Sequence, residues 1–126
     1  MENPRHVIVV HPIPMIVEAI DMTLSMQGFI VHPAQIFRDA RALLMVVGSN
    51  LAAVIAHADM PNQPQPGSLL RLVRKSHPDA ALVVLSAREK GELGRLPRRS
   101  VLLREPFDRA ELLAAITAAS DLSAPS

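Results

Sequence analysis

The chain has 126 residues, the length of one domain, and a formal net charge of only +1. Hydrophobic residues make up 49% of it and aromatic residues 2%, so a core must consist of Val, Leu, Ile, Ala and Met. The absence of cysteine excludes disulfides, thiolate metal sites and cysteine nucleophiles. The first ten residues lack the apolar stretch of a signal peptide, and no run approaches the ~18 apolar residues of a membrane span. We therefore expect a cytoplasmic protein that does not contact a membrane.

Five short apolar runs predict five β-strands. They occupy residues 6–10, 29–31, 52–56, 81–85 and 100–103. The runs are continuous rather than alternating, which is typical of strands covered by helices on both faces.

Segments of helical periodicity separate the runs, and one helix is expected after each strand. The first helix ends at Gly28 and the second at Gly48, and the third spans residues 68–77. The segment 88–96 is the weakest of the five because two glycines interrupt it.

The last helix has the clearest start signal. Asp108 is followed three residues later by Glu111, which is the spacing of an N-cap and capping box, and Pro106 lies just before it. The apolar stripe of this helix ends near residue 119. We expect one domain over residues 1–119 and a flexible tail, or the start of a linker, over residues 120–126.

Alternating strands and helices predict an α/β domain with a doubly wound parallel sheet. Ligand chemistry in such folds lies at the carboxyl ends of the strands. His11 and Pro12 follow the first strand, His57 follows the third, Ser86 the fourth and Glu105 the fifth. These residues form the predicted site.

The chain resembles the receiver domain of two-component response regulators over nearly its whole length. The segment "HADMP" keeps Met60 and Pro61 after the third strand, "VVLSA" supplies Ser86 after the fourth, and "REPF" keeps Pro106 and Phe107 after the fifth. The resemblance implies a CheY-like, flavodoxin-like fold of five strands in the order 2-1-3-4-5.

The reactive groups of that family are replaced in this chain. His11 and Pro12 stand where the family has the acidic pair that holds magnesium, and His57 stands in the position of the phosphoacceptor aspartate. Glu105 replaces the family's lysine, and Leu102 replaces its switch aromatic. The resemblance therefore implies a degenerate pocket, that is, a pseudo-receiver in two-component or phosphorelay signalling.

The physical requirements of phosphotransfer support this interpretation. Aspartyl phosphorylation needs a carboxylate nucleophile, a divalent cation and a further cation near the transferred group. Magnesium prefers oxygen ligands, and neither His11 nor Pro12 supplies a carboxylate. Glu105 repels a phosphoryl group. We therefore expect no enzymatic activity and no cofactor.

The replacements exchange the sign of one pair. The family has an acid on the third strand and a base on the fifth, whereas this chain has His57 on the third and Glu105 on the fifth. We hypothesise that His57 and Glu105 hydrogen-bond and hold the pocket in one state. The alternative is that both side chains face solvent, as they commonly do at open strand ends.

Two further hypotheses concern the same residues. His11, His57, Asp59 and Glu105 offer nitrogen and oxygen ligands suited to zinc or nickel, but no short ligand spacing supports a metal site, so none is predicted. The second hypothesis is that His57 or Asp59 is phosphorylated by unorthodox chemistry. Alternation along the chain turns the Asp59 side chain away from Ser86.

Positive charge gathers in residues 68–106, which hold nine Lys and Arg residues against four acids. The receiver family uses its fourth helix, fifth strand and fifth helix for dimerisation and output. The corresponding predicted interaction face consists of Arg88, Lys90, Arg95, Arg98, Arg99, Leu102 and Arg104. It implies a protein partner with an acidic surface, such as a histidine kinase, an output domain or a second copy of the chain.

Direct nucleic-acid binding through the basic strip 88–104 is the alternative. The chain has no Tyr or Trp for stacking on bases and no glycine-bracketed recognition motif, which disfavours it.

Overall fold

The structure is a computed structural model of the chain, and it describes residues 5–123 apart from the side chain of Lys90. Its strands are β1 (His6–Val10), β2 (Ile30–Ala34), β3 (Leu51–His57), β4 (Ala81–Ser86) and β5 (Ser100–Arg104). Its α-helices are α1 (Pro14–Met26), α2 (Phe37–Val47), α3 (Ser68–Ser76) and α4 (Arg109–Ser123). Two 3-10 turns, Gly48–Asn50 and Lys90–Glu92, complete the elements.

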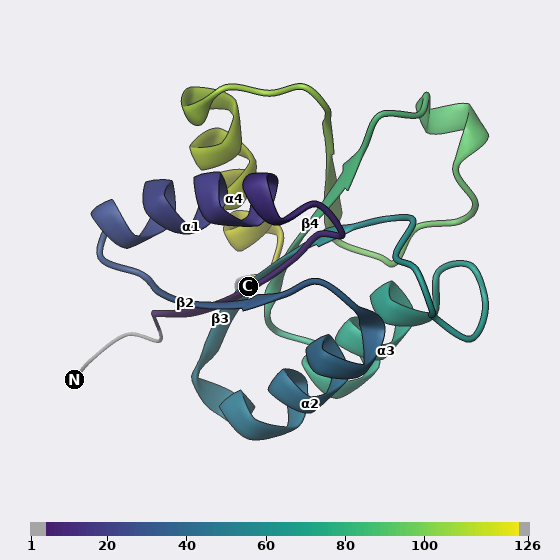
Figure 1. The fold of residues 1–126 in the computed structure, drawn as a ribbon, viewed down its shortest axis with the longest axis horizontal. Helices are drawn as coiled ribbons and strands as arrows, with labels where there is room; N and C mark the ends of the chain where they lie inside the picture. The colour runs from purple at the N-terminus through teal and green to yellow at the C-terminus, as the bar shows by residue number, and fades with distance from the viewer. Residues whose placement is uncertain (1–4, 124–126) are drawn as a thin grey trace.

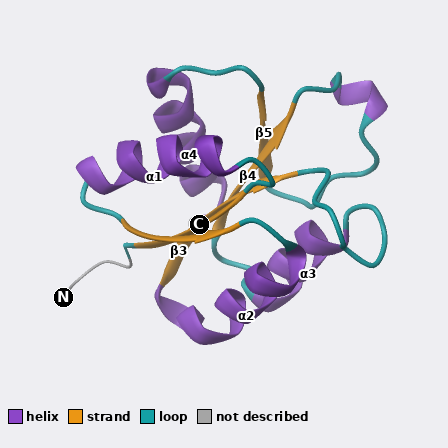
Figure 2. Ribbon diagram, viewed as in Figure 1, coloured by secondary structure: helices purple, strands orange, loops and turns teal. Residues whose placement is uncertain are grey.

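The five strands form one parallel sheet in the order β2-β1-β3-β4-β5. Figure 2 shows the strands in orange between the purple helices. Helices α1 and α4 cover one face and α2 and α3 the other, as Figure 1 shows. Each face of the sheet has its own apolar cluster. Alternate residues along β1, β3 and β4 belong to opposite clusters. The predicted doubly wound α/β fold and strand order are confirmed, and the three central strands are almost completely buried.

None of the helices within residues 5–123 has the length and apolar character needed to cross a membrane.

The prediction of a helix over residues 88–96 was wrong. Only the single 3-10 turn Lys90–Glu92 forms there, and an irregular segment leads from it to β5. Gly91 and Gly94 make helix formation unfavourable, and Pro97 cannot donate a backbone hydrogen bond. The face expected from a fourth helix, the fifth strand and a fifth helix therefore lacks its first component.

Helix α4 starts at the predicted capping box. The backbone N–H of Glu111 donates to Oδ1 of Asp108 at 2.8 Å, and the backbone N–H of Asp108 donates to Oε1 of Glu111 at 3.0 Å. The helix continues to Ser123, whose buried hydroxyl donates to the carbonyl of Ala80 at 3.2 Å. Residues 120–123, expected in a tail, therefore belong to the helix, and residues 124–126 lie outside the described part of the chain.

Replacing the N-cap tests how much the capping box contributes. Asp108→Ala removes the acceptor of the Glu111 N–H, and we expect it to lower the free energy of unfolding by about 1 kcal/mol in urea denaturation. Asp121→Ala, at an exposed position near the other end of the same helix, serves as the control, with an expected change within about 0.5 kcal/mol. Equal effects of the two substitutions would contradict a role for the cap.

Candidate functional site

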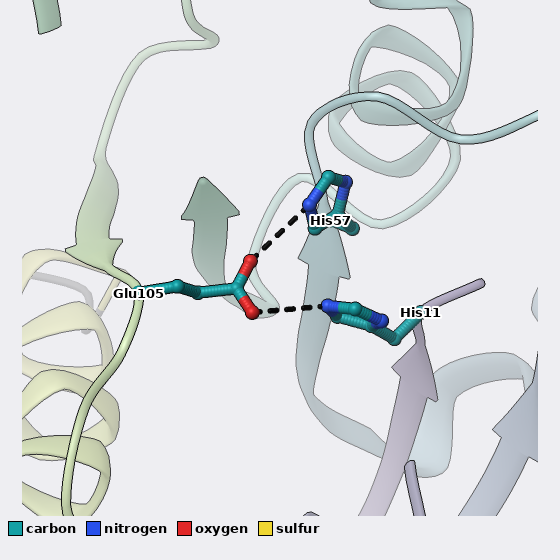
Figure 3. A group of neighbouring side chains, drawn as sticks. All are labelled: His11, His57 and Glu105. Atoms are coloured by element: carbon teal, nitrogen blue, oxygen red, sulfur yellow. Dashed lines mark hydrogen bonds and ion pairs between the residues drawn. The ribbon is translucent and has the colours of Figure 1, made fainter. Parts of the chain in front are cut away.

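Three side chains from three strands converge at the carboxyl edge of the sheet (Figure 3). His11 follows β1, His57 is the last residue of β3 and Glu105 follows β5. Nε2 of His11 lies 3.1 Å from Oε2 of Glu105, and Nε2 of His57 lies 3.2 Å from Oε1. Both carboxylate oxygens of Glu105 are therefore bound by imidazole rings. We call this group the His–Glu–His cluster.

The hydrogen bonds on the other ring nitrogens determine where the protons lie. Nδ1 of His11 accepts the backbone N–H of Ile13 at 3.1 Å, and Nδ1 of His57 accepts the backbone N–H of Asp59 at 3.0 Å. A neutral imidazole has one protonated nitrogen, so an accepting Nδ1 places the proton on Nε2. The N–H of His11 then hydrogen-bonds to the Glu105 carboxylate, and Nε2 of His57 lies within ion-pair distance of the other carboxylate oxygen.

Burial keeps His11 neutral. Its side chain is 1% exposed, and its pKa lies below the ordinary histidine value because burial disfavours the imidazolium. The hydrogen bond and the charge of Glu105 oppose that shift, and His57 adds to it. The direction agrees with the geometry, because a second ring proton on Nδ1 would face the N–H of Ile13.

The other two predicted polar residues do not join the cluster. Ser86 is fully buried, and its Oγ accepts the backbone N–H of Arg88 at 3.0 Å. Asp59 is exposed and pairs with Arg88, whose guanidinium lies 2.6 Å from Oδ1. Pro12 is half-buried in the turn that leads to α1 and has no polar side-chain atom.

The His–Glu–His cluster contains residue types that commonly bind metals, but its ring protons do not lie where they do in metal-bound histidines. One ligand atom from each of His11, His57 and Glu105 lies within 4.8 Å of the others. Metal-bound histidines coordinate through one nitrogen and donate the N–H of the other to an acceptor. Here the outer nitrogens accept backbone N–H groups instead, so Nε2 is protonated rather than free for coordination. Asp59, the hypothesised fourth ligand, is turned toward Arg88. The geometry therefore favours a proton-bridged cluster over a metal centre.

Sequence reasoning predicted a hydrogen bond between His57 and Glu105, and it brought His11 near the same carboxylate only in the metal hypothesis. The sequence did indicate that His11 and His57 would be neighbours, because they lie at the ends of two adjacent strands. Val10 of β1 aligns with Ala56 of β3, so the next residues, His11 and His57, lie side by side. Their rings are 4.6 Å apart between centroids, in an edge-to-face arrangement.

The predicted interaction face is divided by the tertiary structure. Arg88 pairs with Asp59, and Arg104 pairs with Glu89 at 2.9 Å. Arg99 is half-buried and donates to the carbonyl of Pro78 at 2.8 Å, and Leu102 packs against the core. The Lys90 side chain lies outside the described part. Arg95 and Arg98 are the members that remain exposed without an ion pair within the described residues.

No family model matches the sequence, and no curated protein matches it. Solved structures match its fold. A response regulator receiver protein from Sinorhizobium medicae WSM419 is 19% identical, with a TM-score of 0.79 over 94% of this chain and 96% of its own. The signal receiver domain of an HD domain-containing protein from Pseudomonas fluorescens Pf-5 is 22% identical, with a TM-score of 0.76 over 98% of this chain and 91% of its own. The beryllofluoride-activated NtrC4 receiver domain, a dimer, is 16% identical, with a TM-score of 0.81 over 95% of this chain and 99% of its own. The chain therefore has the receiver-domain fold.

The lowered pKa of His11 predicts a loss of stability in acid. Below the ordinary pKa of histidine the unfolded chain takes up a proton that the folded chain refuses, so the free energy of unfolding falls as the pH decreases from 7 toward the lower folded pKa. His32, whose pKa is lowered by burial and by the charge of His6, acts in the same direction. Urea denaturation at pH 7 and pH 5 should show a smaller loss in His11→Gln than in the unchanged chain. An equal loss in both would contradict the assignment to His11.

A double-mutant cycle tests the coupling of His57 and Glu105. His57→Asp places two carboxylates together and Glu105→Lys opposes two N–H donors with an ammonium group. We expect each to lower the free energy of unfolding by roughly 1–3 kcal/mol. The double variant should recover part of the loss, because it restores one opposite-charge pair but leaves the N–H of His11 facing a cation.

The exposed pair Arg104 and Glu89 provides the control for this cycle. Its coupling in the corresponding alanine cycle should be about 0–1 kcal/mol, as for other surface ion pairs. Additive effects of His57→Asp and Glu105→Lys would show that the two side chains do not depend on each other.

Proposed function

We propose that the chain is a pseudo-receiver, a non-catalytic module that acts in two-component or phosphorelay-type signal transduction through contacts with a protein partner, without phosphorylation. The receiver-domain fold supports the signalling role. One observation supports the proposal that the module acts without phosphorylation. Both histidines contact the Glu105 carboxylate at the strand ends, where the resemblance puts the phosphoacceptor.

The cluster is unsuited to phosphoryl transfer for electrostatic reasons. A phosphoryl group is negatively charged and needs a cation opposite it, whereas the centre of this pocket is a carboxylate between two imidazole rings. Both nitrogens of His57 are already engaged, by Asp59 N–H and by Glu105. Arg88 is the nearest described cation to Asp59. Its guanidinium pairs with the Asp59 carboxylate on the surface.

A second candidate is phosphorylation by unorthodox chemistry, and one observation favours Asp59 over His57 for it. Asp59 is an exposed carboxylate with a guanidinium 2.6 Å away, so it has a nucleophilic oxygen and a neighbouring cation. It also lies two residues after the end of β3.

The expected partner is a protein with an acidic surface, such as a histidine kinase, an output domain or a second copy of the chain. Arg95 and Arg98 are exposed and support this expectation. A homodimer across this side would have to use β5 and α4 together with the irregular segment before β5, since a helix is missing there. Nucleic-acid binding remains the alternative for the same charges.

The proposal predicts that the chain does not accept a phosphoryl group. Intact mass should be unchanged after incubation with acetyl phosphate and magnesium, because the pocket has neither an acceptor carboxylate with a free face nor a cation opposite it. A receiver with its acceptor aspartate intact, treated in parallel, shows that the donor is active.

If a phosphoryl group is added, single substitutions identify the residue that carries it. Phosphorylation that persists in Asp59→Asn but is lost in His57→Gln would place the group on the cluster and would overturn the proposal. Loss in Asp59→Asn alone would overturn it as well, in favour of a displaced acceptor. Ser86→Ala serves as a matched control, because its hydroxyl is buried and already accepts a backbone N–H.

A further inference from the structure

A groove between α3 and the irregular segment before β5 collects positive charge from two parts of the chain. Its lining residues are Arg71, Arg74 and Lys75 of α3 together with Arg95, Leu96, Pro97 and Arg98. It is a shallow groove, broadly open to solvent, with a volume of about 580 Å³. We call it the cationic groove.

The charges of the cationic groove have the same sign, and none of them pairs with a carboxylate within the described residues. The lining contains five basic side chains and no acid. None of the five takes part in an ion pair within residues 5–123, whereas Arg88 and Arg104, elsewhere on this side, are each paired with a carboxylate. Like charges held together repel, so a bound anion would relieve an unfavourable interaction as well as form new hydrogen bonds.

The wall of the groove is fixed in place by hydrogen bonds. Arg74 donates to the carbonyls of Pro78 at 2.8 Å and Ala80 at 3.0 Å, and Arg99 donates to the same Pro78 carbonyl at 2.8 Å. These bonds tie the end of α3 to the segment that leads into β5. These bonds occupy the donors of Arg74, so Arg74 supports the wall of the groove, and a preformed wall loses little entropy when a ligand binds.

Burial and the crowding of guanidinium groups both disfavour the charge of Arg74. Burial lowers the pKa of Arg74, the neighbouring charge of Arg99 lowers it further, and Asp79 offsets only part of the shift. The Nε–H groups of Arg74 and Arg99 are buried without a partner among the described residues. The protein therefore concentrates positive charge here beyond what its own acceptors balance.

We propose that the cationic groove binds a small ligand that carries two or more phosphate groups, of the class of nucleoside triphosphates. Arg95 and Arg98 are exposed, and their planar guanidinium groups match the oxygens of a phosphate in pairs, whereas the guanidinium of Arg74 is occupied by backbone carbonyls. Leu96 and Pro97 provide an apolar surface between the charges, against which a sugar or base packs.

The compactness of the groove favours clustered phosphates over an acidic protein segment. Carboxylates along a peptide are spaced by the backbone, whereas a triphosphate places several negative charges within one small volume. A nucleic-acid strand presents the same phosphate chemistry, but it is larger than the groove, and the chain lacks Tyr and Trp for stacking on its bases. The assignment goes beyond the proposed signalling role, and the cationic groove shares no lining residue with the His–Glu–His cluster.

Calorimetric titration of the whole chain with adenosine triphosphate tests the proposal, with adenosine as the ligand that lacks phosphate. We expect binding of the triphosphate, no binding of adenosine, and weaker binding as salt increases. The double variant Arg95→Glu, Arg98→Glu should bind at least tenfold more weakly. Both side chains are exposed and form no ion pair with another described residue, so their replacement should not prevent folding.

The matched control is the double variant Arg41→Glu, Arg109→Glu, which changes the net charge equally on exposed positions of α2 and α4 that form no ion pair with another described residue. Its affinity for the triphosphate should stay within about twofold of the unchanged chain, since screening weakens distant charges. Equal losses in both double variants, or no binding of the triphosphate by the unchanged chain, would overturn the proposal.

Two further probes separate the ligand classes. A short single-stranded DNA that binds more tightly than the triphosphate would assign the groove to nucleic acid instead. Binding of a polyglutamate peptide without binding of the triphosphate would assign it to an acidic protein segment. Either result would overturn the assignment to a small phosphorylated ligand, and neither depends on whether the chain accepts a phosphoryl group.

Discussion

The arrangement at the strand ends depends on one carboxylate, that of Glu105. It lies after β5 and receives polar contacts from rings that follow β1 and end β3, so it connects the middle of the sheet to its edge. Both rings are oriented by backbone N–H groups two residues further along the chain. A partly buried acid with both oxygens bound is stable, whereas removal of either ring leaves one oxygen without its donor. The turns after β1 and β3 and the segment after β5 are held by this group.

This constraint bears on the proposal that the chain is a pseudo-receiver. A receiver pocket must be open to a cation and a phosphoryl group, whereas at the positions that the resemblance assigns to that pocket Glu105 hydrogen-bonds to His11 and lies 3.2 Å from His57. A pocket satisfied by its own side chains has little to gain from a ligand. Such a domain is suited to present one conformation to a partner rather than to switch between two, which is the role that we propose for this chain.

The segment between β4 and β5 accounts for much of the remaining surface. Two glycines and Pro97 prevent a helix there, and the irregular chain that results leaves the cationic groove against α3. The same segment carries Arg95 and Arg98, which a helix would have presented differently. The loss of one helix thus changes both the expected dimerisation face and the distribution of free positive charge.

The sequence by itself determined the elements with strong local signals. Continuous apolar runs predicted the strands, alternation with helices predicted the parallel sheet, and Asp108 and Glu111 predicted the start of α4, because these features depend on neighbouring residues. Only the tertiary structure decided which side chains meet. His11 and Glu105 are 94 residues apart, and the strand register brings them together. Which arginines are paired and which line the groove likewise depends on contacts between distant segments, such as Arg88 with Asp59 and α3 with Arg95.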